Sequence, residues 1–145
     1  MELRTEVEID AAPERVWAVL TDFSRYAEWN PFITSIAGEL EVGRKLSVTL
    51  SPPDSRDWTF RPSLLVCDAP NELRWRGHLW VKGLFDGEHF FQCREAEGGR
   101  TRFVHGENLS GFLVKYVMAS LTNVTRGFVY MNQALKKRVE SRAGS

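Results

Sequence analysis

The spacing of apolar residues changes once along the chain, and that change limits the folds that the chain can adopt. Between residues 32 and 108, short runs of alternating apolar and polar residues are separated by turns rich in Gly, Pro, Asn and Asp. Alternation with period two is typical of half-buried strands, and short turns between strands favour antiparallel pairing. We therefore expect strands at about 33–38, 44–51, 58–67, 72–81, 85–96 and 100–108.

After Gly111 the apolar residues recur at steps of three and four, which is the spacing of one face of a helix. The pattern predicts a long helix that follows Gly111 and ends near Ser141. Its apolar stripe consists of Val117, Leu121, Val124, Phe128, Met131, Leu135 and Val139.

The N-terminal segment adds one strand and two short helices. Residues 3–9 alternate strictly and predict a half-buried strand. Pro13 suits the first turn of a helix, because its missing N–H group has no partner there, and a second short helix is expected through Tyr26. Seven antiparallel strands cannot bury their faces alone, so we expect the long helix to lie in the curve of the sheet. The sequence thus predicts one α+β domain over residues 1–145.

Charge and cysteine content argue against several classes of protein. The 19 Lys and Arg residues balance 19 Asp and Glu residues, which argues against a nucleic-acid binder that relies on phosphate attraction. No apolar run is long enough to span a membrane, and the first residues lack the pattern of a signal peptide. Cys67 and Cys93 stand in no metal-binding or redox spacing. We therefore expect a cytoplasmic protein with reduced thiols that needs no metal or cofactor and does not insert stably into a membrane.

Several motifs are similar to those of a known family. Residues 9–17 read IDAAPERVW, and residues 29–32 read WNPF. The later segments that fit are LTD at 20–22, Tyr26, LRWRG at 73–77, GEHFF at 87–91 and TRFVHGENLSG at 101–111. Together they resemble the START-related SRPBCC superfamily, in its polyketide cyclase/dehydrase-like branch.

The helix-grip fold of that superfamily matches the architecture predicted above. In this fold a curved seven-stranded antiparallel sheet wraps around the long C-terminal helix, and two short helices follow the first strand. The resemblance implies a cavity between the sheet and that helix. Because members of the superfamily include lipid carriers, cyclases and resistance proteins, the resemblance implies a fold more firmly than a function.

Two histidines and a glutamate form a candidate polar cluster. If residues 97–99 make a three-residue hairpin loop, three pairs oppose each other across the flanking strands. These pairs are Cys93–Phe103, Phe91–His105 and His89–Glu107. The cluster of His89, His105 and Glu107 could act as acid and base, orient a ligand, or order the strands as a structural pair. A shift of one residue would separate the cluster, so it depends on the loop.

Aromatic residues on the same faces are candidates for the wall of a cavity. They are joined by Val124 and Phe128 of the long helix. Gly77, Cys93 and Gly127 are small residues where large ones are common, and each would leave space. The alternative is that the aromatic rings simply fill the core. With the polar cluster, the candidate ligand-binding residues are Trp58, Phe60, Trp75, Gly77, His89, Phe91, Phe103, His105, Glu107, Val124 and Phe128.

The function expected from these features is the binding, transport or sequestration of a small hydrophobic molecule, of lipid, polyketide-like or aromatic character. One alternative is a cyclase or dehydratase that uses the His/Glu cluster, although no catalytic residue is assigned. The other is a protein-interaction module similar to chaperone-activating members of the superfamily, with a filled core. Residues 112–119 are apolar on more than one side, as expected of a buried helix start, a portal or a homodimer contact.

Overall fold

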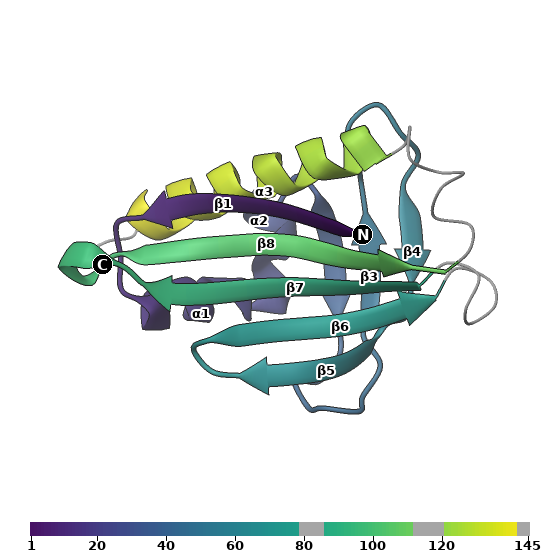
Figure 1. The fold of residues 1–145 in the computed structure, drawn as a ribbon, viewed down its shortest axis with the longest axis horizontal. Coiled ribbons are helices and arrows are strands. Elements are labelled where there is room, and N and C mark those ends of the chain that lie inside the picture. The colour runs from purple at the N-terminus through teal and green to yellow at the C-terminus, as the bar shows by residue number, and fades with distance from the viewer. Residues whose placement is uncertain (79–85, 112–120, 142–145) are drawn as a thin grey trace.

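The computed structural model of the protein describes residues 1–78, 86–111 and 121–141. Figure 1 shows the order and arrangement of its elements. They are β1 (Glu2–Ile9), α1 (Pro13–Leu20), the 3-10 helix η1 (Phe23–Arg25), α2 (Tyr26–Trp29), β2 (Ile33–Ala37), β3 (Ser47–Leu50), β4 (Trp58–Phe60), β5 (Ser63–Asp68), β6 (Glu72–His78), β7 (Asp86–Glu95), the 3-10 helix η2 (Glu97–Gly99), β8 (Thr101–Ser110) and α3 (Leu121–Ser141).

The strands form two antiparallel sheets, and the prediction of a single seven-stranded sheet is wrong. One sheet has five strands in the order β1-β8-β7-β6-β5, and the other has three in the order β2-β3-β4. The expected strand at 58–67 is divided at Pro62, which has no N–H group to donate to a neighbouring strand. Its first part, β4, pairs with β3, and its second part, β5, pairs with β6. The segment before β3 is joined to the start of β5 by a bridge between Lys45 and Ser63 and by a 2.9 Å hydrogen bond from the Leu64 N–H group to the Arg44 carbonyl.

Helix α3 confirms the predicted apolar stripe over the residues that the structure describes. It runs along β1 at one edge of the five-stranded sheet (Figure 1). The predicted start of this helix, with Val117, lies outside the described residues, as does the apolar segment 112–119. The stripe residues that are buried are Leu121, Phe128, Met131, Leu135 and Val139, and Val124 is half-buried.

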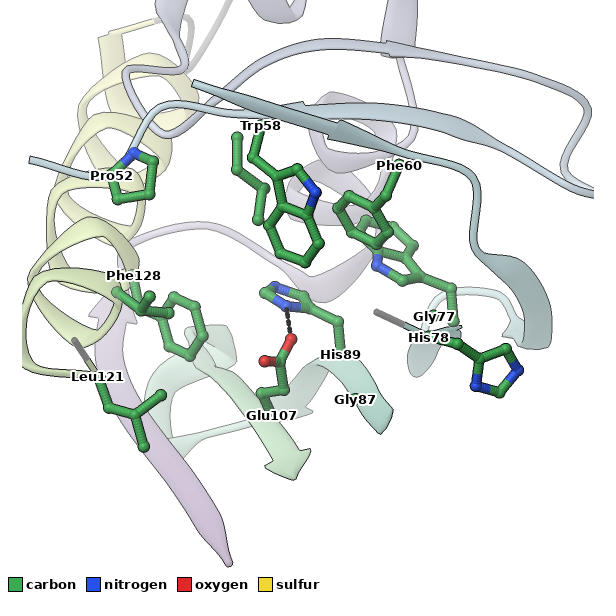
Figure 2. Close-up of a pocket in the computed structure, with 13 residues that line it drawn as sticks. Pro52, Trp58, Phe60, Gly77, His78, Gly87, His89, Glu107, Leu121 and Phe128 are labelled. Carbon is green, nitrogen blue, oxygen red and sulfur yellow. Dashed lines mark hydrogen bonds and ion pairs between the residues drawn. The ribbon is translucent and has the colours of Figure 1, made fainter. Parts of the chain in front are cut away.

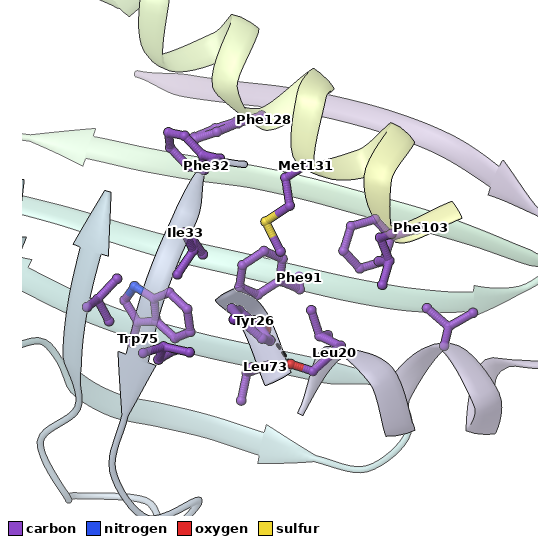
Figure 3. Close-up of a cluster of buried hydrophobic side chains, with 14 of the residues drawn as sticks. Leu20, Tyr26, Phe32, Ile33, Leu73, Trp75, Phe91, Phe103, Phe128 and Met131 are labelled. Atoms are coloured by element: carbon purple, nitrogen blue, oxygen red, sulfur yellow. Dashed lines mark hydrogen bonds between the residues drawn. The ribbon is translucent and has the colours of Figure 1, made fainter. Parts of the chain in front are cut away.

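The core lies between the five-stranded sheet and the helices that cover one of its faces (Figure 3). Rings from the sheet, such as Phe91 and Phe103, meet Phe128 and Met131 of α3 there. The two predicted short helices are present. They are joined by a hydrogen bond that the buried Tyr26 hydroxyl donates to the Leu20 carbonyl.

The hairpin between β7 and β8 has the predicted register. Cys93 pairs with Phe103, Phe91 with His105, and His89 with Glu107. The loop is closed by a 2.7 Å hydrogen bond from the Ala96 N–H group to the Arg100 carbonyl. Gly98 and Gly99 have φ angles of 75° and 77°, a conformation that favours glycine. The loop therefore keeps the polar cluster on one face of the sheet.

Candidate functional site

A cavity of about 100 Å³ lies at the end of the core where α3 begins. Its floor is formed by β6, β7 and β8, and it is covered by the three-stranded sheet and α3 (Figure 2). Register places Trp75, His89 and Glu107 in one row across the floor. The next row toward the strand ends contains Gly77 and Gly87, which pair with each other.

Most of the candidate residues line this cavity, and three do not. Phe91, Phe103 and His105 are buried deeper, where α3 packs closely on the sheet. Because they share the inward face of the strands with the others, strand parity alone cannot separate the two groups. The candidate residues in the wall are Trp58, Phe60, Trp75, Gly77, His89, Glu107, Val124 and Phe128.

Five further residues line the cavity and were not predicted from the sequence: Leu50, Pro52, His78, Gly87 and Leu121. The first two come with the separate three-stranded sheet, which no local pattern reveals. His78 has the outward parity of its strand, and its exposed ring at the rim bonds Asp86 at 2.8 Å. Gly87 could have been predicted from the sequence, because a glycine inside a strand often marks a place where another group approaches the backbone closely.

The cavity is not created by the three small residues that were expected to leave space, Gly77, Cys93 and Gly127. A Cβ atom added at Gly127 would lie 2.3 Å from the ring of Phe32, and one added at Gly77 would lie 3.0 Å from the ring of Phe60. Both glycines thus make room for an aromatic ring. Cys93 belongs to the packed core, and burial raises the pKa of its thiol to about 12.

A chain of hydrogen-bonded side chains leads from the cavity into the core. Glu107 Oε1 lies 3.0 Å from His89 Nδ1, and His89 Nε2 lies 2.7 Å from His105 Nε2. On the other side of the second imidazole, His105 Nδ1 lies 2.9 Å from Asn132 Oδ1. Asn132 Nδ2 in turn donates to Thr5 Oγ1 at 2.8 Å, and this hydroxyl donates to the His105 carbonyl at 2.8 Å. These hydrogen bonds thus join β1, β7, β8 and α3.

His105 is held in its neutral form. Its ring is fully buried and stacks on Phe128, with 4.3 Å between the ring centroids. Burial lowers the pKa of His105 well below its usual value, and the nearby His89 lowers it further. Hydrogen bonds with Asn132 and with the backbone of Phe128 oppose this shift, as acceptors of its N–H group do, but they are the smaller effects.

Thr5 and Asn132, at the inner end of this series of hydrogen bonds, fix the direction of the other hydrogen bonds in it. The single proton of the Thr5 hydroxyl goes to a carbonyl, so that hydroxyl must accept from the amide nitrogen of Asn132. The Asn132 oxygen therefore accepts from His105 Nδ1. In a neutral imidazole this leaves His105 Nε2 as an acceptor, so His89 donates to it from Nε2. The remaining contact in this series is the one between His89 Nδ1 and Glu107 Oε1.

Glu107 has capacity for a ligand, whereas the polar atom of Trp75 is enclosed. Glu107 makes one hydrogen bond within the described residues, through Oε1, and its second oxygen has none. The indole N–H group of Trp75 is buried and has no partner among the described residues. The indole nitrogen is too deeply buried to meet a ligand, whereas the second oxygen of Glu107, whose side chain is 19% exposed, can accept a hydrogen bond from one.

A helix-grip fold with an aromatic cavity places the chain in the START-related class of proteins. The sequence model of the family "Polyketide cyclase / dehydrase and lipid transport" matches residues 1–140, and the chain belongs to this family. The resemblance seen in the sequence motifs is thereby confirmed. No curated protein has a matching sequence.

Solved structures share the fold at low sequence identity. The Zhui aromatase/cyclase from Streptomyces sp. R1128 superposes with a TM-score of 0.75 at 17% identity, over 100% of this chain and 96% of that one. A START superfamily protein from Mycobacterium smegmatis has a TM-score of 0.75 at 16% identity, over 97% of each chain. The protein TTHA0849 from Thermus thermophilus has a TM-score of 0.75 at 18% identity, over 100% of both chains. These likenesses establish the fold.

Two other features bear on possible partners. Among the described helices, none has both the length and the apolar character needed to cross a membrane. Within the same part of the chain, no three His, Cys, Asp or Glu side chains are grouped so that they could hold a metal ion.

Proposed function

We propose that the protein binds a small hydrophobic molecule in this cavity and holds the polar end of the molecule at Glu107. The observation that carries the proposal is the contrast within the wall. Aromatic and aliphatic side chains surround a carboxylate whose second oxygen is unpaired within the described residues. Apolar burial would supply affinity at about 25 cal/mol per Å², and the carboxylate would supply orientation.

The volume limits what the cavity encloses. An engineered apolar cavity of about 150 Å³ takes up benzene. The present cavity, at about 100 Å³, is smaller, so it encloses at most one ring or the end of a longer molecule. The rest of a lipid or polyketide-like ligand would extend beyond it. The class of ligand that the cavity fits best is thus a small aromatic compound.

The proposal is tested by binding measurements on the purified protein. Native mass spectrometry should detect a small molecule that co-purifies with it. Small aromatic ligands should quench tryptophan fluorescence saturably, because Trp58 and Trp75 line the cavity. Replacing Trp58 with Phe should reduce the quenched signal, whereas the same change at Trp29, outside the cavity, should not. No co-purifying molecule and no quenching by a broad aromatic panel would refute the proposal.

A second candidate function is acid–base catalysis of a cyclisation or dehydration. The observation that favours it is the hydrogen bond of 3.0 Å between His89 Nδ1 and Glu107 Oε1 beside the cavity. A cyclase would turn over a cyclisable ketone, and Glu107→Gln would lower that turnover by about 100-fold or more while binding persists. Equal turnover by the variant and the wild type would exclude this role.

The remaining alternative, a protein-interaction module, was expected to have a filled core, and the cavity counts against it.

A further inference from the structure

An apolar groove lies outside the cavity, between α3 and β1. It has a volume of about 470 Å³, and its apolar wall is formed by Met1, Leu3, Leu121, Val129 and Tyr130. The side chains of Met1, Val129 and Tyr130 are 42–50% exposed, so the groove is open to water. The one charged residue among the described residues of its wall is Arg126, which is paired with Asp54 at 3.2 Å. The groove therefore suits an uncharged alkyl chain better than a charged group.

The groove and the cavity are neighbours on one face of the five-stranded sheet. Trp75 pairs with His89, and His89 pairs with Glu107. Glu107 pairs in turn with Leu3 of the edge strand β1. Directly paired residues of antiparallel strands point to the same face. The first three side chains of this row line the cavity, and Leu3 lines the groove. Because neighbouring strands are about 4.8 Å apart, a single strand spacing separates the two spaces.

Leu121 stands between the groove and the cavity. Of the described residues, it alone lines both. One turn further along α3, Val124 lines only the cavity and Thr125 lines only the groove. Residues three and four positions after Leu121 lie on either side of its own row on the helix, so the boundary follows from helical spacing. Leu121 is 8% exposed, and its carbonyl accepts a 2.9 Å hydrogen bond from the Thr125 hydroxyl. In Figure 2 its side chain lies beside Phe128, where α3 begins.

We infer that Leu121 limits the length of the ligand, and that the groove would accept the alkyl tail of a longer ligand if this side chain were smaller. The inference rests on the proposed function and names a residue that determines its specificity. A ligand seated in the cavity meets Leu121 on the side toward β1. A tail that leaves past the exposed Trp58 reaches water instead, where it gains little from burial. The wild-type protein therefore selects rings with short substituents.

Four uncharged probes of increasing length test this inference by isothermal titration calorimetry: phenol, 4-ethylphenol, 4-butylphenol and 4-hexylphenol. The quantity compared is the ratio of the association constants of 4-hexylphenol and 4-ethylphenol within one variant, in which effects common to all probes cancel. In the wild type this ratio should lie within about threefold of one. In Leu121→Ala it should rise about tenfold or more, because burial of each added methylene group raises affinity by up to about fourfold.

A second variant at the same position carries the test if Leu121→Ala does not fold, which circular dichroism would show. Leu121→Val removes one carbon atom instead of three, so it disturbs the start of α3 less. It should raise the same ratio by about twofold or more, and the effect should be smaller than that of Leu121→Ala.

Val124→Ala is the matched control. It also shortens an apolar side chain in the cavity wall, but Val124 does not line the groove. The ratio should stay within about twofold of the wild-type value. A rise as large as that of Leu121→Ala would show that the volume of the cavity, and not a path into the groove, sets the length of the ligand. That result would overturn the inference.

The place of the tail is tested by adding Val129→Asp to Leu121→Ala. Val129 lies in the groove and is 42% exposed, so the substitution does not disturb the core. An aspartate there should lower the ratio of the Leu121→Ala variant by about fivefold or more, because its charge must stay hydrated where the tail would lie. An unchanged ratio would show that the tail lies elsewhere, and the inference would be wrong.

Two outcomes separate this inference from the proposed function. If the Leu121 variants bind phenol and show the wild-type ratio, Leu121 does not limit the length of the ligand, and the proposed function stands. If the wild type binds none of the four probes and no small molecule co-purifies with it, the proposed function fails and the inference fails with it.

Discussion

The two ends of the space under α3 are built on the same face of the same strands, yet one is filled and the other is hollow. At the filled end, Phe91 and Phe103 stack on each other and pack against Met131, as Figure 3 shows. At the hollow end, the three-stranded sheet forms part of the cover, and its Trp58 remains 39% exposed (Figure 2). Strand parity therefore decides which side chains face inward, but the covering element decides whether they fill the space.

The largest expected effect is at the boundary between the two ends, where Phe128 touches both. Its ring is fully buried, stacks on His105 and lines the cavity. Phe128→Ala should lower the free energy of unfolding by about 3–5 kcal/mol, because it removes a large buried side chain and leaves a void. Urea unfolding followed by circular dichroism measures this loss.

The control for that measurement is Lys137→Ala on the exposed side of α3, which should change stability by no more than about 0.5 kcal/mol. Equal losses in the two variants would show that Phe128 does not join the two ends.

A smaller effect is expected from overfilling the packed region. Gly127→Ala would place a methyl group 2.3 Å from the ring of Phe32, which is itself buried and cannot move freely. Overpacking of this kind costs about 1–3 kcal/mol, although alanine is the better helix former by about 1 kcal/mol. We expect a net loss of stability, measured by urea unfolding. A more stable variant would mean that this part of the core is loosely packed.

The elements that local sequence patterns specify were predicted correctly. The period of the apolar residues predicted the α3 stripe, and the glycines of the 97–99 loop predicted the β7–β8 register. It missed the second sheet, because pairing of β2, β3 and β4 depends on contacts between distant segments rather than on their own patterns. Pro62 marks the break between β4 and β5, but the apolar alternation on either side of it is the same as that of one continuous strand.

The candidate site was predictable only in part for the same reason. Parity and the hairpin loop placed His89 opposite Glu107. The partners that fix the direction of their hydrogen bonds are Thr5 and Asn132, which are 127 residues apart in sequence and meet only in the folded chain. No spacing rule connects them, so the direction of these hydrogen bonds could not be predicted before the fold was known.

The filled end should also make stability depend on pH through His105. Its pKa is lower in the folded protein than in the unfolded chain, where it is about 6.5. The unfolded state therefore binds more protons at pH values below about 6.5, and stability falls as the pH decreases toward the folded pKa. One such group contributes at most about 1.4 kcal/mol per pH unit. Urea unfolding at pH 7.5 and pH 5.0 measures the loss.

His105→Gln removes this titration and should flatten the pH dependence, whereas His78→Gln, at an exposed ring, should leave it steep. A wild-type protein that is equally stable at both pH values would mean that His105 is not held neutral by burial.

The smallest effect on stability is expected at the hollow end, from Gly87→Ala. The added methyl group would lie 3.3 Å from the carboxyl carbon of Glu107. Unlike the Phe32 ring, the Glu107 side chain is 19% exposed and can shift. Alanine is also favoured over glycine in a strand by about 0.5–1 kcal/mol. The two effects oppose each other, so stability should change by less than about 1 kcal/mol, whereas the affinity for small aromatic ligands with a polar end should fall as Glu107 is displaced. A loss of stability as large as that of Gly127→Ala would show that the hollow end is packed as rigidly as the filled one.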